Sequence, residues 1–106
     1  TMQIQVNTDS HIEGHEKLAS HVKHVVQSAL GRFGDRITRV EVHLSDQNGD
    51  KTGQEDKRCT MEVRLKGRQP TAISHDAATL AKAVDGAASR AQRSIESTLG
   101  RLHDHS

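Results

Sequence analysis

Apolar residues alternate with polar residues in four short stretches of the chain, near residues 2–7, 39–45, 57–66 and 71–74. Successive side chains of a strand point to opposite faces, so this period of two predicts four half-buried strands. The third stretch alternates most clearly, and its apolar set is Cys59, Met61, Val63 and Leu65. Its polar set, on the opposite face, is Thr60, Glu62, Arg64 and Lys66.

Two longer segments repeat apolar residues at spacings of three and four, which predicts amphipathic helices. The apolar positions of the first helix are Leu18, Val22, Val25, Val26, Ala29, Leu30 and Phe33. Those of the second are Leu80, Val84, Ala87, Ala88, Ala91, Ile95, Leu99 and Leu102. We expect Gly34 to end the first helix in the left-handed conformation. We expect Asp76 to cap the start of the second helix.

The predicted order is β-α-β-β-β-α, and two amphipathic helices need one apolar sheet face to cover. The sequence therefore predicts an α+β fold in which both helices pack on one face of a four-stranded sheet. At 106 residues the chain is long enough for one modest core, and we expect a single domain over residues 2–104. The polar segment SDQNGDKTGQEDK (45–57) is expected to form a long hairpin loop, and residues 67–70 a turn.

Composition limits the kinds of partner that the chain can bind. Phe33 is the one aromatic residue, so the chain cannot build a platform on which single-stranded bases stack. The formal net charge is only +1, so any binding of nucleic acid must come from local basic patches that recognise phosphate and shape. No apolar run is long enough to span a membrane and no signal peptide is evident, so we expect a cytoplasmic protein without a membrane partner. The lone cysteine, Cys59, excludes an internal disulfide and is expected to be buried.

Motifs for catalysis or cofactors are incomplete. Ser74, His75 and Asp76 are the residue types of a hydrolase triad, but neighbours in a strand point to opposite faces and cannot converge. Residues 46–57 begin like a calcium loop, yet Lys51 replaces the required glycine and Lys57 the required glutamate. The chain is therefore expected to be no enzyme and to have no cofactor, metal or small-molecule substrate.

Eight histidines leave one alternative open. His21 and His24 share a helical face, while an HExxH pattern that starts at His15 fails because Ala19 takes the place of its second histidine. Solvated surface histidines are the simpler interpretation. The alternative is a stress protein that responds to metal or pH through these side chains.

Basic residues give a stronger signal on the last helix, opposite its apolar line. The members of this ridge are Lys82, Gly86, Arg90, Arg93, Ser97 and Arg101. Small residues between the cations would let a phosphate backbone approach closely. The competing interpretation is an ordinary solvated helix face on which Asp85 and Glu96 neutralise the cations. Arg64 and Lys66 would form a second basic surface on the open side of the sheet.

The order of elements and three segments resemble one known family. The segments are LGRFGDRI (30–37), VEVHLS (40–45) and AVDGAASRAQRSI (83–95). Over essentially its whole length, the chain resembles the ribosome hibernation promoting factor and protein Y family, also called ribosome-associated inhibitors or sigma modulation proteins. The resemblance implies a stress or stationary-phase factor that binds rRNA of the small ribosomal subunit in the mRNA and tRNA channel and inhibits translation.

The resemblance implies rRNA-binding roles for Arg32, Arg90 and Arg93. We add four positions from the charge pattern alone: Lys82, Arg101, Arg64 and Lys66. Departures from the family pattern are Leu80, where an aromatic residue is common, and a lower total charge.

Because the chain ends at Ser106, we expect a short form that lacks the dimerisation domain of long members. A general double-stranded RNA-binding module remains the second alternative. The sequence leaves the oligomeric state open.

Overall fold

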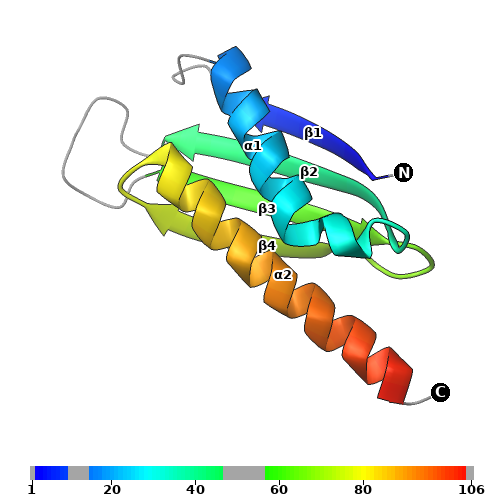
Figure 1. The fold of residues 1–106 in the computed structure, drawn as a ribbon. Helices are drawn as coiled ribbons and strands as arrows, with labels where there is room; N and C mark the ends of the chain where they lie inside the picture. The colour runs from blue at the N-terminus through cyan, green and yellow to red at the C-terminus, as the bar shows by residue number, and fades with distance from the viewer. Residues whose placement is uncertain (1, 10–14, 47–56, 105–106) are drawn as a thin grey trace.

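The computed structural model describes residues 2–9, 15–46 and 57–104. These residues form four strands, β1 (Gln3–Thr8), β2 (Ile37–Asp46), β3 (Lys57–Leu65) and β4 (Thr71–Ala77). They also form two α-helices, α1 (His15–Leu30) and α2 (Leu80–Asp104), and a short 3₁₀ helix, η1 (Gly31–Phe33). The order is β-α-β-β-β-α, so the predicted α+β fold is confirmed (Figure 1).

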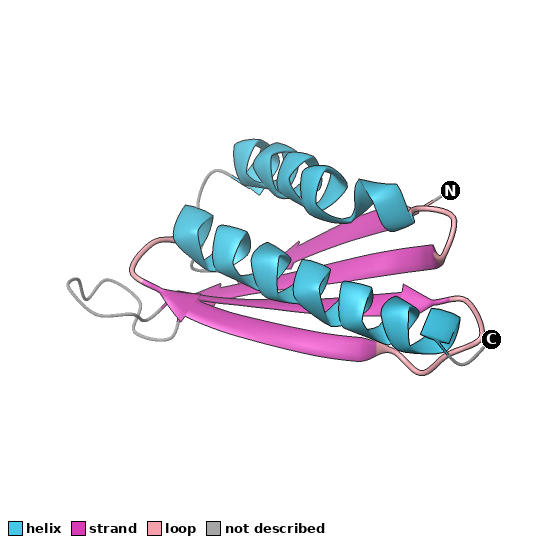
Figure 2. Cartoon of the chain, turned by 60° about the horizontal axis from the view of Figure 1, so that its bottom comes forward, coloured by secondary structure: helices cyan, strands magenta, loops and turns pink. Residues whose placement is uncertain are grey.

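The strands lie in the sheet in chain order, β1-β2-β3-β4. β1 pairs with β2 in parallel because α1 carries the chain back across the sheet between them. β3 is antiparallel to both β2 and β4. Both helices cover the same face of the sheet, and the other face carries no helix of the described chain (Figure 2). We call the uncovered side the open face.

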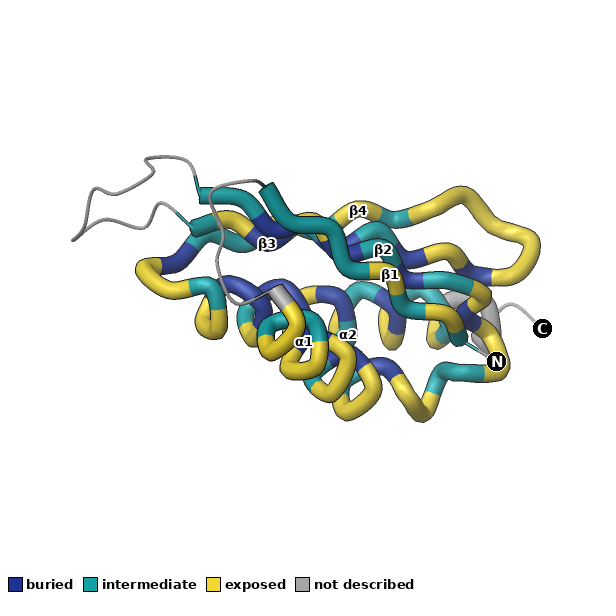
Figure 3. Tube along the Cα trace, turned by 90° about the horizontal axis from the view of Figure 1, so that it is seen from above, coloured by how far each residue is buried: buried dark blue, intermediate teal, exposed yellow. Residues whose placement is uncertain are grey.

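The core lies between the sheet and the helices, where the buried segments of both layers face each other (Figure 3). The alternation in β3 is borne out, since Cys59, Met61, Val63 and Leu65 are buried while Arg64 is exposed. Burial raises the pKa of the Cys59 thiol to about 12, so this side chain acts as a small hydrophobic residue, as expected.

The start of α2 differs from the prediction. β4 continues to Ala77, so Asp76 is a strand residue and forms an ion pair with Arg58 of β3. Thr79 caps α2 instead: its Oγ1 accepts a hydrogen bond from the backbone N–H of Lys82, at 3.2 Å. The prediction that Asp76 caps the helix is wrong because its cross-strand partner lies 18 residues earlier and is not visible in the local sequence.

The end of α1 also differs from the prediction. Gly34 has φ −55° and ψ −31°, which is the right-handed conformation, and its N–H donates to the carbonyl of Gly31. The helix therefore tightens into the 3₁₀ turn η1 and does not end at a left-handed glycine. Within the described residues, Gly67 is the one with positive φ, at 71°, and it forms the tight turn between β3 and β4. Of the loop expected at 45–57, the first two residues lie in β2 and the last in β3, and residues 47–56, with most of the calcium-like positions, lie outside the described residues.

Candidate nucleic-acid interface

Three cations project from the surface of α2. Lys82, Arg90 and Arg93 are exposed, opposite the buried positions Val84, Ala91 and Ile95. These three are the described cations of the longer ridge predicted from the sequence, and we call Lys82, Arg90 and Arg93 the cationic ridge. Arg101, the fourth predicted cation, lies in the last turns of the helix, where only the backbone is described.

Gly86 does not provide the open space that the sequence suggested. A Cβ atom at this position would lie 2.1 Å from Cδ2 of His75, so the imidazole ring already occupies the space beside the helix backbone. The glycine therefore serves close packing between α2 and β4, and phosphate access between the cations is not its role.

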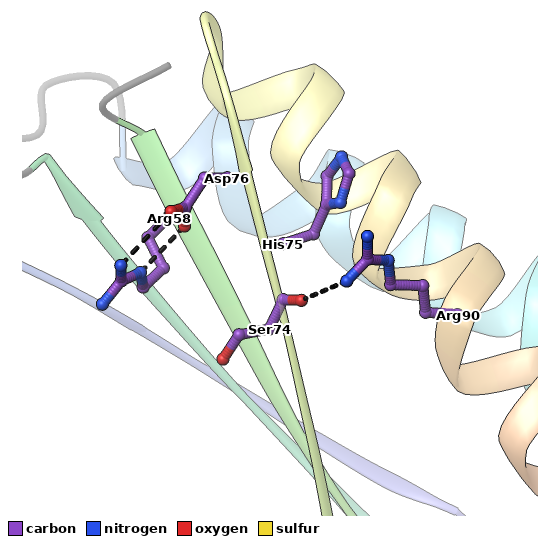
Figure 4. Close-up of a pocket in the computed structure, with 5 residues that line it drawn as sticks. All are labelled: Arg58, Ser74, His75, Asp76 and Arg90. Carbon is purple, nitrogen blue, oxygen red and sulfur yellow. Dashed lines mark hydrogen bonds and ion pairs between the residues drawn. The ribbon is translucent and has the colours of Figure 1, made fainter.

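Arg90 lies beside the outer edge of β4. Its Nη1 donates a hydrogen bond of 3.3 Å to the backbone carbonyl of Ser74, which Figure 4 shows from the side. In the part of the chain that the structure describes, no carboxylate pairs with Arg90, Lys82 or Arg93. The guanidinium of Arg90 keeps its other donors available to a ligand.

The two described carboxylates of α2 reach toward α1 and η1 and do not neutralise the ridge. Asp85 Oδ1 lies 3.9 Å from Nε2 of His21. Glu96 forms an ion pair with Arg32 of η1. His24 lines a hollow of about 380 Å³ between the two helices, with Ala88 and Gln92 among its neighbours. The competing interpretation, in which Asp85 and Glu96 neutralise the ridge cations, does not agree with the structure, because these carboxylates lie beside His21 and Arg32.

Arg32, one of the predicted binding residues, is held from two sides. Its guanidinium pairs with Glu96, and its Cζ lies 4.9 Å from the centroid of the Phe33 ring. The side chain is nevertheless 58% exposed, so its outer face is open to a ligand. An exposed ion pair of this kind is weak and can exchange for a phosphate.

The open face of the sheet carries balanced charges. Among the described residues three arginines project from it, and each has a carboxylate partner: Arg39 with Glu41 at 3.0 Å, Arg64 with Glu62 at 3.4 Å, and Arg58 with Asp76 at 2.8 Å. The Arg58 side chain donates two hydrogen bonds to Asp76, and this bonding lowers the pKa of the carboxyl group. Arg64, which the sequence suggested as a phosphate contact, is thus one member of a neutralised set.

A second group of cations gathers near the turn after β3. Lys66 and Arg68 are exposed there, and the backbone N–H of Lys66 donates to the backbone carbonyl of Arg36, an exposed cation in the neighbouring chain segment. No carboxylate pairs with these three side chains among the described residues. Sequence reasoning did not select Arg36, because its proximity to Lys66 depends on a contact across 30 residues that no local pattern reveals.

Residues of catalytic type do not converge. Ser74 and Asp76 lie on the open face, where the Ser74 hydroxyl is 2.9 Å from that of Thr60, whereas His75 points toward α2 (Figure 4). No group of three histidine, cysteine, aspartate or glutamate side chains suited to a metal ion occurs within the described segments. No helix in those segments is long and apolar enough to cross a membrane.

The fold is that of a small α+β domain, and exposed cations lie along its last helix. Residues 4–103 match the family described as sigma 54 modulation protein / S30EA ribosomal protein, and the chain belongs to this family. Comparison with curated proteins gives no match.

Two solved structures share the fold. The N-terminal domain of Protein Y from Thermus thermophilus is 22% identical, with a TM-score of 0.73, and the match covers 92% of this chain and 99% of that one. A ribosomal subunit interface protein from Coxiella burnetii is 15% identical, with a TM-score of 0.62, over 97% and 99% of the two chains.

Proposed function

We propose that this protein is a cytoplasmic ribosome-associated factor that binds rRNA of the small subunit in the mRNA and tRNA channel and inhibits translation under stress or in stationary phase. Membership of the family of sigma 54 modulation and S30EA ribosomal proteins supports association with the ribosome. The factor acts by occupying the channel, and this role requires a binding surface and no catalytic group.

The observation that carries this proposal is the separation of paired from unpaired cations. The arginines of the open face are matched by carboxylates, whereas the cationic ridge and the turn cations Arg36, Lys66 and Arg68 have no carboxylate partner within the described residues. Unpaired exposed cations can neutralise phosphates and release the counterions that these hold. We therefore assign the principal rRNA contacts to the helical side and the turn.

Arg32 supplies a contact of a different kind. It lies beside α2, where Glu96 occupies its guanidinium, so binding of a phosphate there requires exchange of one anionic partner for another. Lys66 is one of the turn cations that have no carboxylate partner among the described residues, and Arg101 is proposed as a contact from its position in the last turns of α2. Arg64 is the weakest of the proposed rRNA contacts because Glu62 already neutralises it.

Sedimentation with purified small ribosomal subunits tests the proposal. The protein should travel with the subunit at low salt, and the logarithm of the affinity should fall linearly with the logarithm of the salt concentration. The three ridge cations alone should contribute a slope of about −2 to −3. An affinity that does not change between low and moderate salt would contradict the phosphate model.

Competition separates this function from general recognition of double-stranded RNA. Excess RNA duplex of arbitrary sequence should leave the protein on the subunit if the ribosomal channel is the target. Displacement by equal amounts of duplex would favour the general module, because such modules read the shape of any A-form helix.

A further inference from the structure

In the sheet formed by the described residues, β4 is an edge strand with one strand neighbour, β3. The carbonyl of Ser74 accepts its hydrogen bond from Arg90 and so points away from β3. Ser74 lies opposite Thr60, and their hydroxyl oxygens are 2.9 Å apart, which agrees with the close spacing of a non-hydrogen-bonded antiparallel pair. Ala72, Ser74 and Asp76 therefore all direct their backbone N–H and C=O groups outward.

This edge lacks the usual protection against strand pairing. β4 is seven residues long and contains no lysine, no proline and no bulge in its register with β3. Among the described contacts, the one group that covers the outward backbone is the guanidinium of Arg90 on the Ser74 carbonyl. One side-chain hydrogen bond is therefore made at an edge where a neighbouring strand would form a row of backbone hydrogen bonds.

The same edge borders a hollow of about 460 Å³ lined by Arg58, Ser74, His75, Asp76 and Arg90. Figure 4 shows Arg58 and Asp76 on one side of β4 and His75 and Arg90 on the other. Arg58 and Asp76 neutralise each other in an ion pair. The charged group of this hollow that has no carboxylate partner among the described residues is therefore Arg90, which lies near His75. An added strand would direct alternate side chains toward Arg90, where acidic groups are favoured.

We propose that the outer edge of β4 binds an extended acidic segment of a partner protein, which adds to the sheet as a fifth strand. Its backbone pairs with Ala72, Ser74 and Asp76, and one of its carboxylates takes the Arg90 guanidinium from the Ser74 carbonyl. Charge argues against a second copy of this chain, because antiparallel pairing of two β4 strands would bring two cationic ridges together. The inference does not rest on the proposed rRNA binding.

Fluorescence anisotropy with a synthetic probe tests the proposal. The probe is a capped nine-residue peptide with glutamate at alternate positions and valine between, and the control has lysine in place of glutamate. The glutamate peptide should bind and the lysine peptide should not. The substitution Arg90→Gln should weaken the glutamate peptide about threefold, as loss of an exposed ion pair predicts.

Backbone pairing has a signature of its own. Only every second N–H group of the peptide would face β4. N-methylation of the nitrogens that face β4 should therefore abolish binding, whereas N-methylation of the intervening nitrogens should be tolerated. Ser74→Pro removes an outward N–H that β3 does not use, and it should weaken the peptide about tenfold with an unchanged circular dichroism spectrum. The methylated peptides need no altered protein, so the test holds even if this variant folds poorly.

Three results would overturn the proposal. Equal tolerance of both methylation patterns would exclude strand addition. Loss of RNA affinity in Ser74→Pro, with no binding of the glutamate peptide to the parent protein, would make this edge an RNA surface. Conversion of a dimer to a monomer by the same substitution would make it a contact between two copies. Failure of ribosome binding with intact peptide binding would reject only the function proposed above.

Discussion

The imidazole of His75 takes the space that a side chain at Gly86 would fill. A Cβ atom on Gly86 would lie 2.1 Å from Cδ2 and 2.7 Å from Cγ of His75, so the base of the ring is too close as well as its tip. Strand β4 and helix α2 therefore pack closely at this point, where Gly86 of α2 has no side chain and the His75 ring of β4 occupies the space beside it.

This contact predicts a change of sign in a double-mutant cycle. Gly86→Ala should destabilise the protein by about 1–3 kcal/mol, because the new methyl group overpacks the contact. In a His75→Ala background the same substitution should stabilise it by up to about 1 kcal/mol, which is the normal helix preference of alanine over glycine. Urea unfolding of all four proteins measures both values. A stabilising Gly86→Ala in the presence of His75 would show that the ring rotates away at little cost.

The next prediction compares the cationic ridge with the open face. Replacing Lys82 and Arg93 by alanine should lower affinity for the small subunit at least about tenfold and reduce the salt slope by about two, one unit for each lost phosphate contact. The matched control, Arg39→Ala with Arg64→Ala, removes the same formal charge from side chains that carboxylates neutralise. It should have a much smaller effect in the same co-sedimentation assay. A larger loss in the control would move the interface to the open face.

The ion pair between Glu96 and Arg32 predicts a gain of affinity. Glu96→Gln releases the Arg32 guanidinium and removes an anion that a phosphate must displace, so subunit binding should tighten about threefold or more. Thermal stability should change little, since exposed pairs contribute about 0–1 kcal/mol. Asp85→Asn is the control, because it removes the same charge from the same helix beside His21. Equal gains in both variants would indicate an effect of total charge alone.

A pH titration checks the bidentate contact between Arg58 and Asp76. Hydrogen bonding and charge from Arg58 hold the pKa of Asp76 below its ordinary value of 3.8. A carboxyl group whose pKa is lower in the folded than in the unfolded state stabilises the fold when the pH is above the unfolded-state pKa. This contribution is lost as the pH falls through the folded-state pKa. In Arg58→Gln the pKa, followed by carboxyl NMR shifts, should rise toward 3.8. The stability difference between variant and parent should then shrink below that pH. An unchanged Asp76 titration would mean that the pair does not persist in solution.

Thiol reactivity provides a test of the core. Because burial raises the pKa of Cys59 to about 12, the thiol should resist a water-soluble disulfide reagent at pH 8 and react only after addition of denaturant. Cys59→Ser should cost about 1–3 kcal/mol, since the hydroxyl enters an apolar core. Rapid labelling of the native protein would place β3 outside the packed layer.

Local patterns in the sequence predicted the layers of the fold but not the contacts between distant segments. The alternation from Cys59 to Leu65 identified the buried face of β3, and the spacing from Val84 to Ile95 identified the buried line of α2. Helix ends were less predictable: Asp76 and Thr79 are both good capping residues, and an arginine in another strand decides between them.

For the candidate site, the sequence predicted which cations are exposed but not which of them have a carboxylate partner. Periodicity alone placed Lys82, Arg90 and Arg93 on the exposed side of a helix. It could not show that Glu96 turns toward Arg32 and away from the ridge, or that Glu62 neutralises Arg64. Those pairings determine which cations remain for a ligand, and they depend on the folded arrangement.

The balanced open face also affects how the protein meets its partner. Among the described residues, three arginine and carboxylate pairs lie on the open face and the cations of α2 have no carboxylate partner, a charge asymmetry that the formal net charge of +1 conceals. If the partner is the polyanion proposed above, this asymmetry should turn the helical side toward the phosphates within a Debye length, about 8 Å at physiological salt. A nearly neutral protein can thereby arrive in a productive orientation, and its rate of association should depend on ionic strength more than its net charge suggests.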